Sequence, residues 1–197
     1  MTYKIIDNFL EDEIFKKLKN QLISSTFPWF FMNSTSYPKE MDSESDNLTY
    51  SFSHSVVLSG KKTESMLYNI LKPLLIDSLK KNSEDVTSLE RVRVNCLLNT
   101  NRKWLHTPHI DAEENHKTAI LYIHGDGNTV VFSEKFDLDS GVNGFEYYKT
   151  KLNKLTTVEI ECEPKQNRLF CFNGLHYHAA YNPMISSRRI AIAFNYK

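Results

Sequence analysis

Along the first 88 residues, apolar positions recur mostly at the spacing of a helix. One stripe, with members four residues apart, predicts an amphipathic helix over about 11–24, and a second predicts a helix over about 63–81. The first stripe consists of Ile14, Leu18 and Leu22, and the second of Leu67, Ile70, Leu71, Leu74 and Leu75. Short strands are expected at 3–6 and 48–58. We therefore interpret residues 1–88 as a helical support region.

From residue 89 onward the pattern changes to short apolar runs separated by turn residues, which is typical of strands. The expected strands cover about 89–98, 104–111, 117–124, 129–133, 156–162, 168–172 and 188–196. The polar stretch 134–155 is long for a loop in a compact domain, and we interpret it as a lid. Many short strands behind two helices predict a mainly β, α+β fold, a jelly-roll barrel with residues 89–197 as its core.

Composition limits the class of protein. The chain has 197 residues, 41% of them apolar, which favours one domain over 1–197. Its 24 basic and 24 acidic residues cancel, so bulk charge gives no reason to expect nucleic acid as a partner. The three cysteines lack metal-type spacing and are interpreted as core residues in a reducing, cytoplasmic compartment. No apolar run approaches the length of a membrane span.

Three residues carry the chemistry that the sequence indicates. His109 and Asp111 are two positions apart in an expected strand, so their side chains would share one face. His178 follows a distant apolar run. Two imidazoles and one carboxylate form the facial set that holds non-haem Fe(II) and leaves positions open for O₂ and a co-substrate. This combination predicts an oxygenase.

Other histidines leave the ligand set open. His176 is two residues before His178 and would share its face, so alternation does not choose between them. His106, His116 and His124 are further candidates. Three of these histidines could also bind Zn²⁺, although zinc favours sets of His and Cys.

Two segments resemble the 2-oxoglutarate and Fe(II)-dependent dioxygenases, especially the prolyl hydroxylase-like branch with its phage and bacterial relatives. Residues 108–132 contain the His-x-Asp pair, a strand with Tyr122, a glycine-rich turn and a Thr-x-x-Phe run. Residues 167–195 contain an apolar strand, a turn, a histidine, a proline, an arginine pair and an alternating last strand. The resemblance implies a double-stranded β-helix, the jelly-roll barrel of cupin-like proteins, buttressed by N-terminal helices.

Carried over to this sequence, the resemblance implies that His109, Asp111 and His178 are the iron ligands. It offers Arg188 and Arg189 for the distal carboxylate of 2-oxoglutarate, and the spacing favours Arg189. In the last strand Arg189, Ala191, Ala193 and Asn195 share one small and polar face, whereas Ile190, Ile192 and Phe194 form the opposite face. Tyr122 is expected to contact the same carboxylate, and Asn95 or Asn99 is a weaker candidate for a co-substrate contact.

The implied activity is hydroxylation of an unactivated C–H bond, with release of succinate and CO₂. The cofactors would be Fe(II), 2-oxoglutarate and O₂, with ascorbate as a stimulant. A prolyl or other amino-acid side chain, in a peptide or free, is the first substrate expected. A nucleic-acid demethylase of the same superfamily is disfavoured by the balanced charge. The alternatives are a cupin-like protein that binds a metal or small ligand without turnover, and a purely structural domain.

Overall fold

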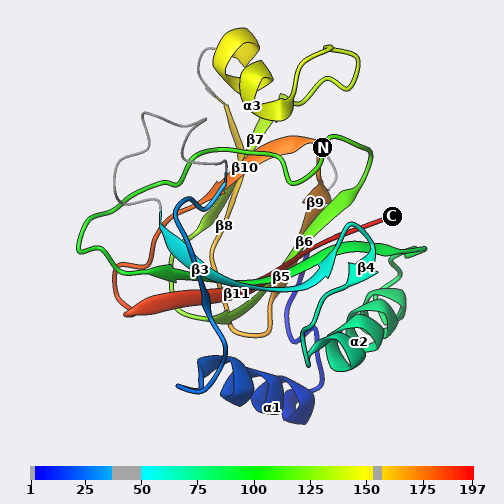
Figure 1. The fold of residues 1–197 in the computed structure, drawn as a ribbon, viewed down its shortest axis with the longest axis vertical. Coiled ribbons are helices and arrows are strands. Elements are labelled where there is room, and N and C mark those ends of the chain that lie inside the picture. The colour runs from blue at the N-terminus through cyan, green and yellow to red at the C-terminus, as the bar shows by residue number, and fades with distance from the viewer. Residues whose placement is uncertain (1–2, 37–49, 153–156) are drawn as a thin grey trace.

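The computed structural model describes residues 3–36, 50–152 and 157–197, and it consists of two antiparallel sheets facing each other (Figure 1). The large sheet follows the order β1 (Lys4–Ile6), β9 (Leu169–Asn173), β6 (Lys117–His124), β11 (Arg188–Tyr196), β5 (Leu89–Leu98), β3 (Ser51–Leu58) and β2 (Phe30–Met32), with β4 (Lys61–Lys62) paired to β3. The small sheet follows the order β10 (His176–Ala180), β7 (Thr129–Lys135) and β8 (Val158–Cys162). This is the expected mainly β, jelly-roll architecture.

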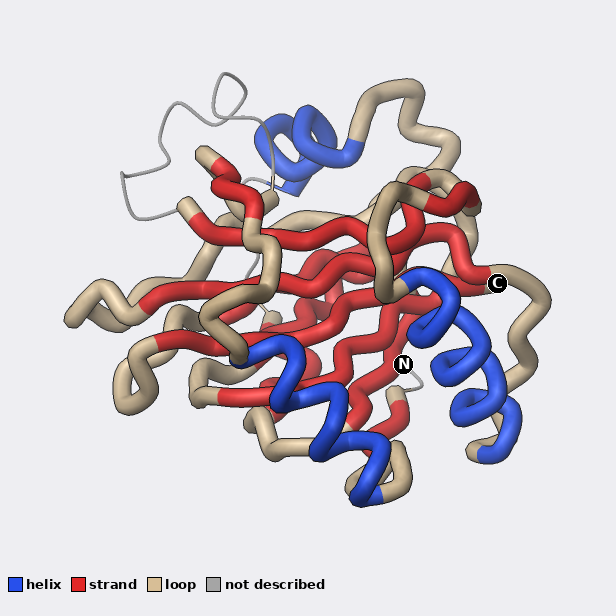
Figure 2. Tube along the Cα trace, turned by 60° about the horizontal axis from the view of Figure 1, so that its bottom comes forward, coloured by secondary structure: helices blue, strands red, loops and turns tan. Residues whose placement is uncertain are grey.

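Two helices, α1 (Asp12–Ile23) and α2 (Tyr68–Lys81), cover the outer face of the large sheet (Figure 2). Strands β5 and β11 alternate, so that one side of each strand packs under the helices. The residues on that side are Val92, Val94, Cys96, Ile190, Ile192 and Phe194. The opposite side of the same strands faces the space between the sheets and carries polar and small residues.

Both helices were predicted, but their buried stripes differ in part from the expected ones. In α1 the buried residues are Phe15, Leu18 and Leu22, whereas Ile14 is 38% exposed. In α2, Leu71, Leu75 and Leu79 are buried, whereas Ile70 is 52% exposed. An α-helix has 3.6 residues per turn, so residues spaced by exactly four rotate gradually away from the buried face. All three cysteines are buried and unpaired, as expected of core residues.

The expected strand over 104–111 is wrong. This segment has only two isolated bridges, Leu105 to Tyr181 and His109 to His178. Pro108 lacks an N–H group and interrupts a regular ladder. Strand β10 was not predicted as a separate element, because its His-Tyr-His-Ala-Ala sequence has no clear apolar alternation.

The support region 1–88 also contributes strands to the large sheet. Strand β1 pairs with β9, β3 pairs with β5, and β2 and β4 pair with β3. These pairings join the N-terminal part of the chain to the barrel by main-chain hydrogen bonds. The part of the expected strand 48–58 that precedes residue 50 lies outside the described residues.

The segment 134–155 is partly helical, with α3 (Gly144–Tyr147) followed by a π-helix, η1 (Tyr148–Leu152). Tyr147, Tyr148 and Leu152 pack against the outer side of the small sheet, with Phe132 and Tyr177. The hydroxyl of Tyr177 donates to the carbonyl oxygen of Gly144 at 2.6 Å. These described residues cover the sheet from outside, which does not fit a lid over the space between the sheets; 153–156 lie outside the described residues.

No helix in the described ranges is both long and apolar enough to cross a membrane.

Candidate metal centre

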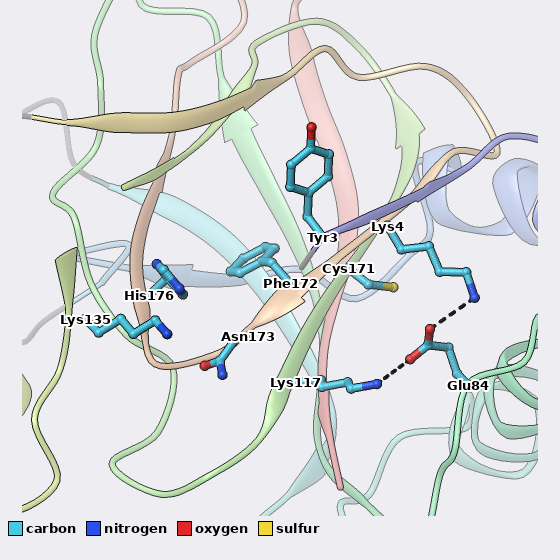
Figure 3. Close-up of a pocket in the computed structure, with 9 residues that line it drawn as sticks. All are labelled: Tyr3, Lys4, Glu84, Lys117, Lys135, Cys171, Phe172, Asn173 and His176. Atoms are coloured by element: carbon cyan, nitrogen blue, oxygen red, sulfur yellow. Dashed lines mark hydrogen bonds and ion pairs between the residues drawn. The ribbon is translucent and has the colours of Figure 1, made fainter. Parts of the chain in front are cut away.

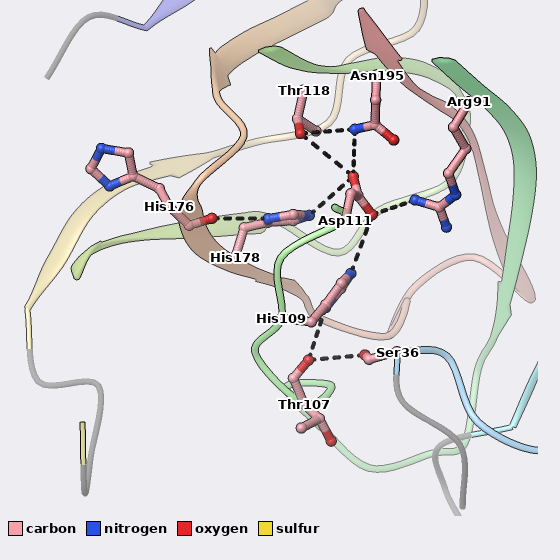
Figure 4. A network of polar contacts seen from close by, with 9 residues as sticks. All are labelled: Ser36, Arg91, Thr107, His109, Asp111, Thr118, His176, His178 and Asn195. Carbon is pink, nitrogen blue, oxygen red and sulfur yellow. Dashed lines mark hydrogen bonds and ion pairs between the residues drawn. The ribbon is translucent and has the colours of Figure 1, made fainter. Parts of the chain in front are cut away.

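The structure brings His109, Asp111 and His178 together between the two sheets (Figure 4). Their three ligand atoms lie within 4.8 Å of one another. The Nε2 atoms of His109 and His178 are each 3.8 Å from an oxygen of Asp111. Within the described ranges, no other cluster of His, Cys, Asp and Glu has this geometry.

A backbone bridge between distant segments aligns the two histidines. The amide of His109 donates to the carbonyl oxygen of His178 at 3.0 Å, and the amide of His178 donates back at 2.9 Å. The two rings are therefore neighbours, with centroids 4.6 Å apart. Asp111 lies in a bend two residues after the bridge. The cluster thus forms without the regular strand that the sequence suggested.

The hydrogen bonds of the two rings fix which nitrogen faces the cluster. Nδ1 of His109 lies 3.0 Å from the carbonyl oxygen of Thr107, and Nδ1 of His178 lies 3.3 Å from that of His176. A carbonyl only accepts, so each Nδ1 carries the proton and each Nε2 presents its lone pair. Burial, and then the neighbouring His178, lower the pKa of His109 to about 3, and burial also lowers the pKa of His178. Both rings are neutral at neutral pH, as a metal requires.

Asp111 is held as a buried carboxylate by several donors. Its side chain is 4% exposed, and Arg91 pairs with Oδ1. Nδ2 of Asn195 donates to Oδ2 at 2.9 Å, and the hydroxyl of Thr118 lies 3.5 Å from the same oxygen. Burial raises the pKa of Asp111, but Arg91 and the two histidines outweigh it and hold that pKa well below its usual range. Two neutral imidazoles and one carboxylate are the donor set of non-haem iron sites, so the cluster fits iron binding.

His176 does not join the cluster. Its Nδ1 donates to the carbonyl oxygen of Phe132 at 2.7 Å, and Figure 4 shows its ring on the far side of the strand from Asp111. The pairing of β10 with β7 shifts register between His176 and His178. This irregularity breaks the strict alternation, so two residues that should share a face do not.

Of the other candidate histidines, only His106 lines the cavity of the cluster. It is 3% exposed, and its Nδ1 lies 2.9 Å from the hydroxyl of Thr35. Its Nε2 is buried without a hydrogen-bond partner among the described residues. His116 packs against Gly174, and His124 lines a different surface cavity.

Arg188 and Arg189 are adjacent but lie on opposite faces of β11. Arg189 is 4% exposed and lines the cavity with the metal cluster. Its Nε donates to the carbonyl oxygen of Gly127 at 2.8 Å, and Nη2 donates to the hydroxyl of Thr129 at 2.9 Å. Arg188 instead donates to the carbonyl oxygen of Ile23 at the end of α1, at 2.7 Å. The alternation of β11 therefore places Arg189 in the cavity.

Of the three other residues expected to contact 2-oxoglutarate, one lines the cavity and two do not. Asn95 lines the cavity. Tyr122 is fully buried beneath Arg189 and does not line it; its hydroxyl donates to that of Thr129 at 2.8 Å. Asn99 lies outside, where its side chain donates to the carbonyl oxygen of Met184 at 3.1 Å.

Sequence reasoning missed two arginines of the same cavity. Arg91 and Arg93 lie two positions apart on β5, whose other face is the apolar Val92 and Val94. A pair of arginines on the inner face of a core strand is itself a signal, because buried charges need partners. The alternation of β5 could have revealed it.

A second cavity, larger than that of the cluster at about 500 Å³, lies between β1, β9 and the start of β10 (Figure 3). Lys4 and Lys117 reach into it from two strands and both pair with Glu84. Cavity size alone would favour this space over the cavity of the cluster. It contains no cluster of metal-ligating groups among the described residues, so the chemistry favours the smaller cavity.

No protein-family model and no curated protein matches the sequence. The fold, however, is similar to solved structures of 2-oxoglutarate and Fe(II) oxygenases. An oxidoreductase of that family from Burkholderia pseudomallei aligns with a TM-score of 0.57 at 10% identity, over 99% of this chain and 85% of that chain. A prolyl-4-hydroxylase from Pseudomonas putida aligns with a TM-score of 0.54 at 10% identity, over 99% and 91%. The α-ketoglutarate-dependent epimerase SnoN of nogalamycin biosynthesis aligns with a TM-score of 0.64 at 13% identity, over 98% and 77%.

At such low identities the likeness is one of fold. The chain has the jelly-roll fold of these oxygenases, and that fold is consistent with the superfamily that the sequence resembles.

Proposed function

We propose that the protein is an Fe(II)- and 2-oxoglutarate-dependent dioxygenase that hydroxylates an unactivated C–H bond. One observation carries the proposal: the cluster of His109, Asp111 and His178 lies in the same cavity as the buried Arg189. The cluster could hold iron, and Arg189 could bind the carboxylate of a co-substrate. A metal-binding protein without this chemistry has no need of a buried guanidinium in the cavity of the metal ligands.

In this proposal His109, Asp111 and His178 hold the iron. Bound iron would supply the activation of O₂, coupled to decarboxylation of 2-oxoglutarate, so that one oxygen atom goes to the C–H bond and the other to succinate. The neutral rings of His109 and His178 donate lone pairs, and the ionised Asp111 supplies the negative charge. The amide of Asn195 and the guanidinium of Arg91 orient that carboxylate.

Arg189 binds the distal carboxylate of 2-oxoglutarate in this proposal. Its guanidinium is fixed by Gly127 and Thr129 at Nε and Nη2, so little side-chain freedom is lost on binding. Ala191 and Ala193, the next inward residues of β11, leave space between Arg189 and the cluster. His106 faces the same cavity; if Thr35 donates to its Nδ1, its Nε2 carries the proton and can donate to the same carboxylate.

The first substrate class that we propose is a prolyl or other amino-acid side chain. Its support is the fold alone: one similar structure is a prolyl hydroxylase from Trichoplax adhaerens bound to a peptide fragment of hypoxia-inducible factor, at 12% identity and a TM-score of 0.57. SnoN, with the same fold, is an epimerase, so the fold does not select one reaction.

The test is an anaerobic titration of metal-free protein with Fe(II) and then 2-oxoglutarate. We expect the visible iron-to-ketoacid charge-transfer band, and slow succinate release once O₂ is admitted. Binding of iron without a band would favour a cupin-like binding protein. Absence of metal binding would overturn the proposal.

A further inference from the structure

A third guanidinium, that of Arg93, lines the cavity with Arg91 and Arg189, and the proposed oxygenase chemistry does not use it. Arg93 is on the inner face of β5, between Arg91 and Asn95, and all three line the cavity. Its Nε is buried and has no hydrogen-bond partner in the described part of the chain. The cavity therefore contains a cationic side chain with a donor atom that no described residue satisfies.

The nearby carboxylate of Asp111 attracts Arg93, but the arginine that it is hydrogen-bonded to is Arg91. Burial, and then repulsion from Arg91, lower the pKa of Arg93 to about 10, so the side chain stays protonated at neutral pH. Arg93 is half-buried, and its Nε is a buried donor of a charged group without a partner in the described ranges; such a group is costly, which favours binding of an anion.

The register of the large sheet separates Arg93 from Arg189. Arg189 lies opposite Leu97, whereas Arg93 lies opposite Ala193, four residues further along β11. Four residues of strand span about 13 Å. Arg93 and Arg189 therefore lie at opposite ends of the cavity.

Arg93 lies instead at the end of the cavity that is next to the metal cluster. Arg91, two residues before it, lies opposite Asn195, and both of these residues contact Asp111. Ala193 presents only a methyl group opposite Arg93, which leaves room above the guanidinium. An anion bound there would lie close to the ligands of the proposed iron.

We propose that Arg93 binds an oxyanion group, a carboxylate or a phosphate, of the primary substrate. The inference rests on the proposed function and adds a substrate class to it: a small anionic molecule, or a residue with an anionic group close to the carbon that is oxidised. Asn95, the next inward residue on β5, is placed to donate a hydrogen bond to the same group.

The test uses acetate and methyl phosphate as probes, with acetamide as the neutral match for acetate. Protein loaded with Fe(II) and 2-oxoglutarate under anaerobic conditions is titrated with each probe by calorimetry, while the charge-transfer band is followed. At least one anion should bind without loss of the band, and acetamide should not bind. In Arg93→Met the anion should bind at least tenfold more weakly.

Two further variants separate charge from packing. Arg93→Lys keeps the positive charge and should retain anion binding within a fewfold. Arg188→Met removes an arginine outside the cavity and should leave the anion affinity unchanged. If only methyl phosphate binds, the group is a phosphate; if only acetate binds, it is a carboxylate.

Three results would overturn the inference. The first is equal anion affinity in Arg93→Met and the wild-type protein. The second is loss of the band when the anion is added, because the anion then takes the place of 2-oxoglutarate. The third is a large loss of 2-oxoglutarate affinity in Arg93→Met, which would assign Arg93 to the co-substrate. If the wild-type protein forms no charge-transfer band, the proposed function itself is wrong. If the band forms but one of the three results above is found, only the assignment of Arg93 is wrong.

Discussion

The guanidinium of Arg189 lies over the face of the Tyr122 ring, with its central carbon 5.3 Å from the ring centre. Both side chains also donate to the hydroxyl oxygen of Thr129. Arg189, Tyr122 and Thr129 thus form one buried unit in which the ring supports the cation from below. The tyrosine orients the arginine, and it does not line the cavity itself.

Tyr122→Phe should therefore have a small effect on 2-oxoglutarate binding. The ring face remains and only the bond to Thr129 is lost, so we expect the Kd to rise less than about fivefold, or about 1 kcal/mol. Tyr122→Leu also removes the ring and should weaken the binding free energy of 2-oxoglutarate by more, about 2 kcal/mol. Titration of the charge-transfer band measures both. A loss in Tyr122→Phe as large as that in Arg189→Met would mean that the hydroxyl contacts the co-substrate directly.

Arg189→Met should raise the Kd for 2-oxoglutarate about 30-fold, because a charge-assisted hydrogen-bond pair contributes about 2 kcal/mol. Arg188→Met is the matched control, since its side chain reaches Ile23 outside the cavity. Iron binding should be unchanged in both variants. An equal effect of the two substitutions would contradict the assignment.

His178→Ala should abolish the charge-transfer band, whereas His176→Ala should keep it. His178 has its Nε2 directed at Asp111, but His176 is bonded to Phe132 away from the cluster. His176→Ala should still lower the melting temperature, because it leaves the buried carbonyl of Phe132 without a donor. The assignment of the ligands is wrong if His176→Ala loses the band and His178→Ala keeps it.

Gly127→Ala should destabilise the protein more than Gly141→Ala. Both glycines have positive φ, +102° and +73°, so alanine is strained at either position. At Gly127, however, a Cβ would lie 2.4 Å from the carbonyl oxygen of Tyr181, whereas at Gly141 nothing lies within 4 Å. We expect the free energy of unfolding to fall by about 1 kcal/mol in Gly141→Ala and by several kcal/mol in Gly127→Ala. Urea unfolding measures the difference; equal losses would show that the loop moves freely.

The stability of the metal-free protein should fall as the pH drops from about 6.5 towards 4. Burial, and then Arg189, lower the pKa of His106 to about 4 in the folded state. Above about pH 6.5 the His106 ring is neutral in both the folded and the unfolded state. Below that pH the ring binds a proton in the unfolded chain but stays neutral in the folded protein until about pH 4, so the folded state loses stability. This one group contributes up to about 1.4 kcal/mol per pH unit inside that window.

His106→Gln should reduce that pH dependence, since glutamine does not titrate and can still bond to Thr35. The urea midpoints of both proteins at about pH 7 and about pH 5 test this. The wild-type midpoint should fall further than that of the variant. His109 and His178 remain in both proteins and contribute equally, so parallel changes would show that His106 is not buried in its neutral form.

The local pattern of the sequence was sufficient for much of the scaffold. Strands β5, β6 and β11 were predicted with the bounds that the structure has. Strands β5 and β11 alternate between an apolar side and a polar or small side, and β6 is a short apolar run. The same alternation placed Arg189, Ala191 and Ala193 on one face. The residue types of the metal cluster were also evident, since a carboxylate and imidazoles in a core-facing region need a partner.

What the sequence determined is the alternation of each strand and the chemical identity of the cluster; what only the tertiary structure decided is which of several candidates meet. His109 and His178 are aligned by a bridge between segments almost 70 residues apart along the chain, in place of the expected strand over 104–111. The choice of His178 over His176 follows from a register shift against β7. Arg91 and Arg93 enter the cavity through the pairing of β5 with β11. Such contacts depend on long-range pairing and on irregular backbone, and neither leaves a periodic signal in the local sequence.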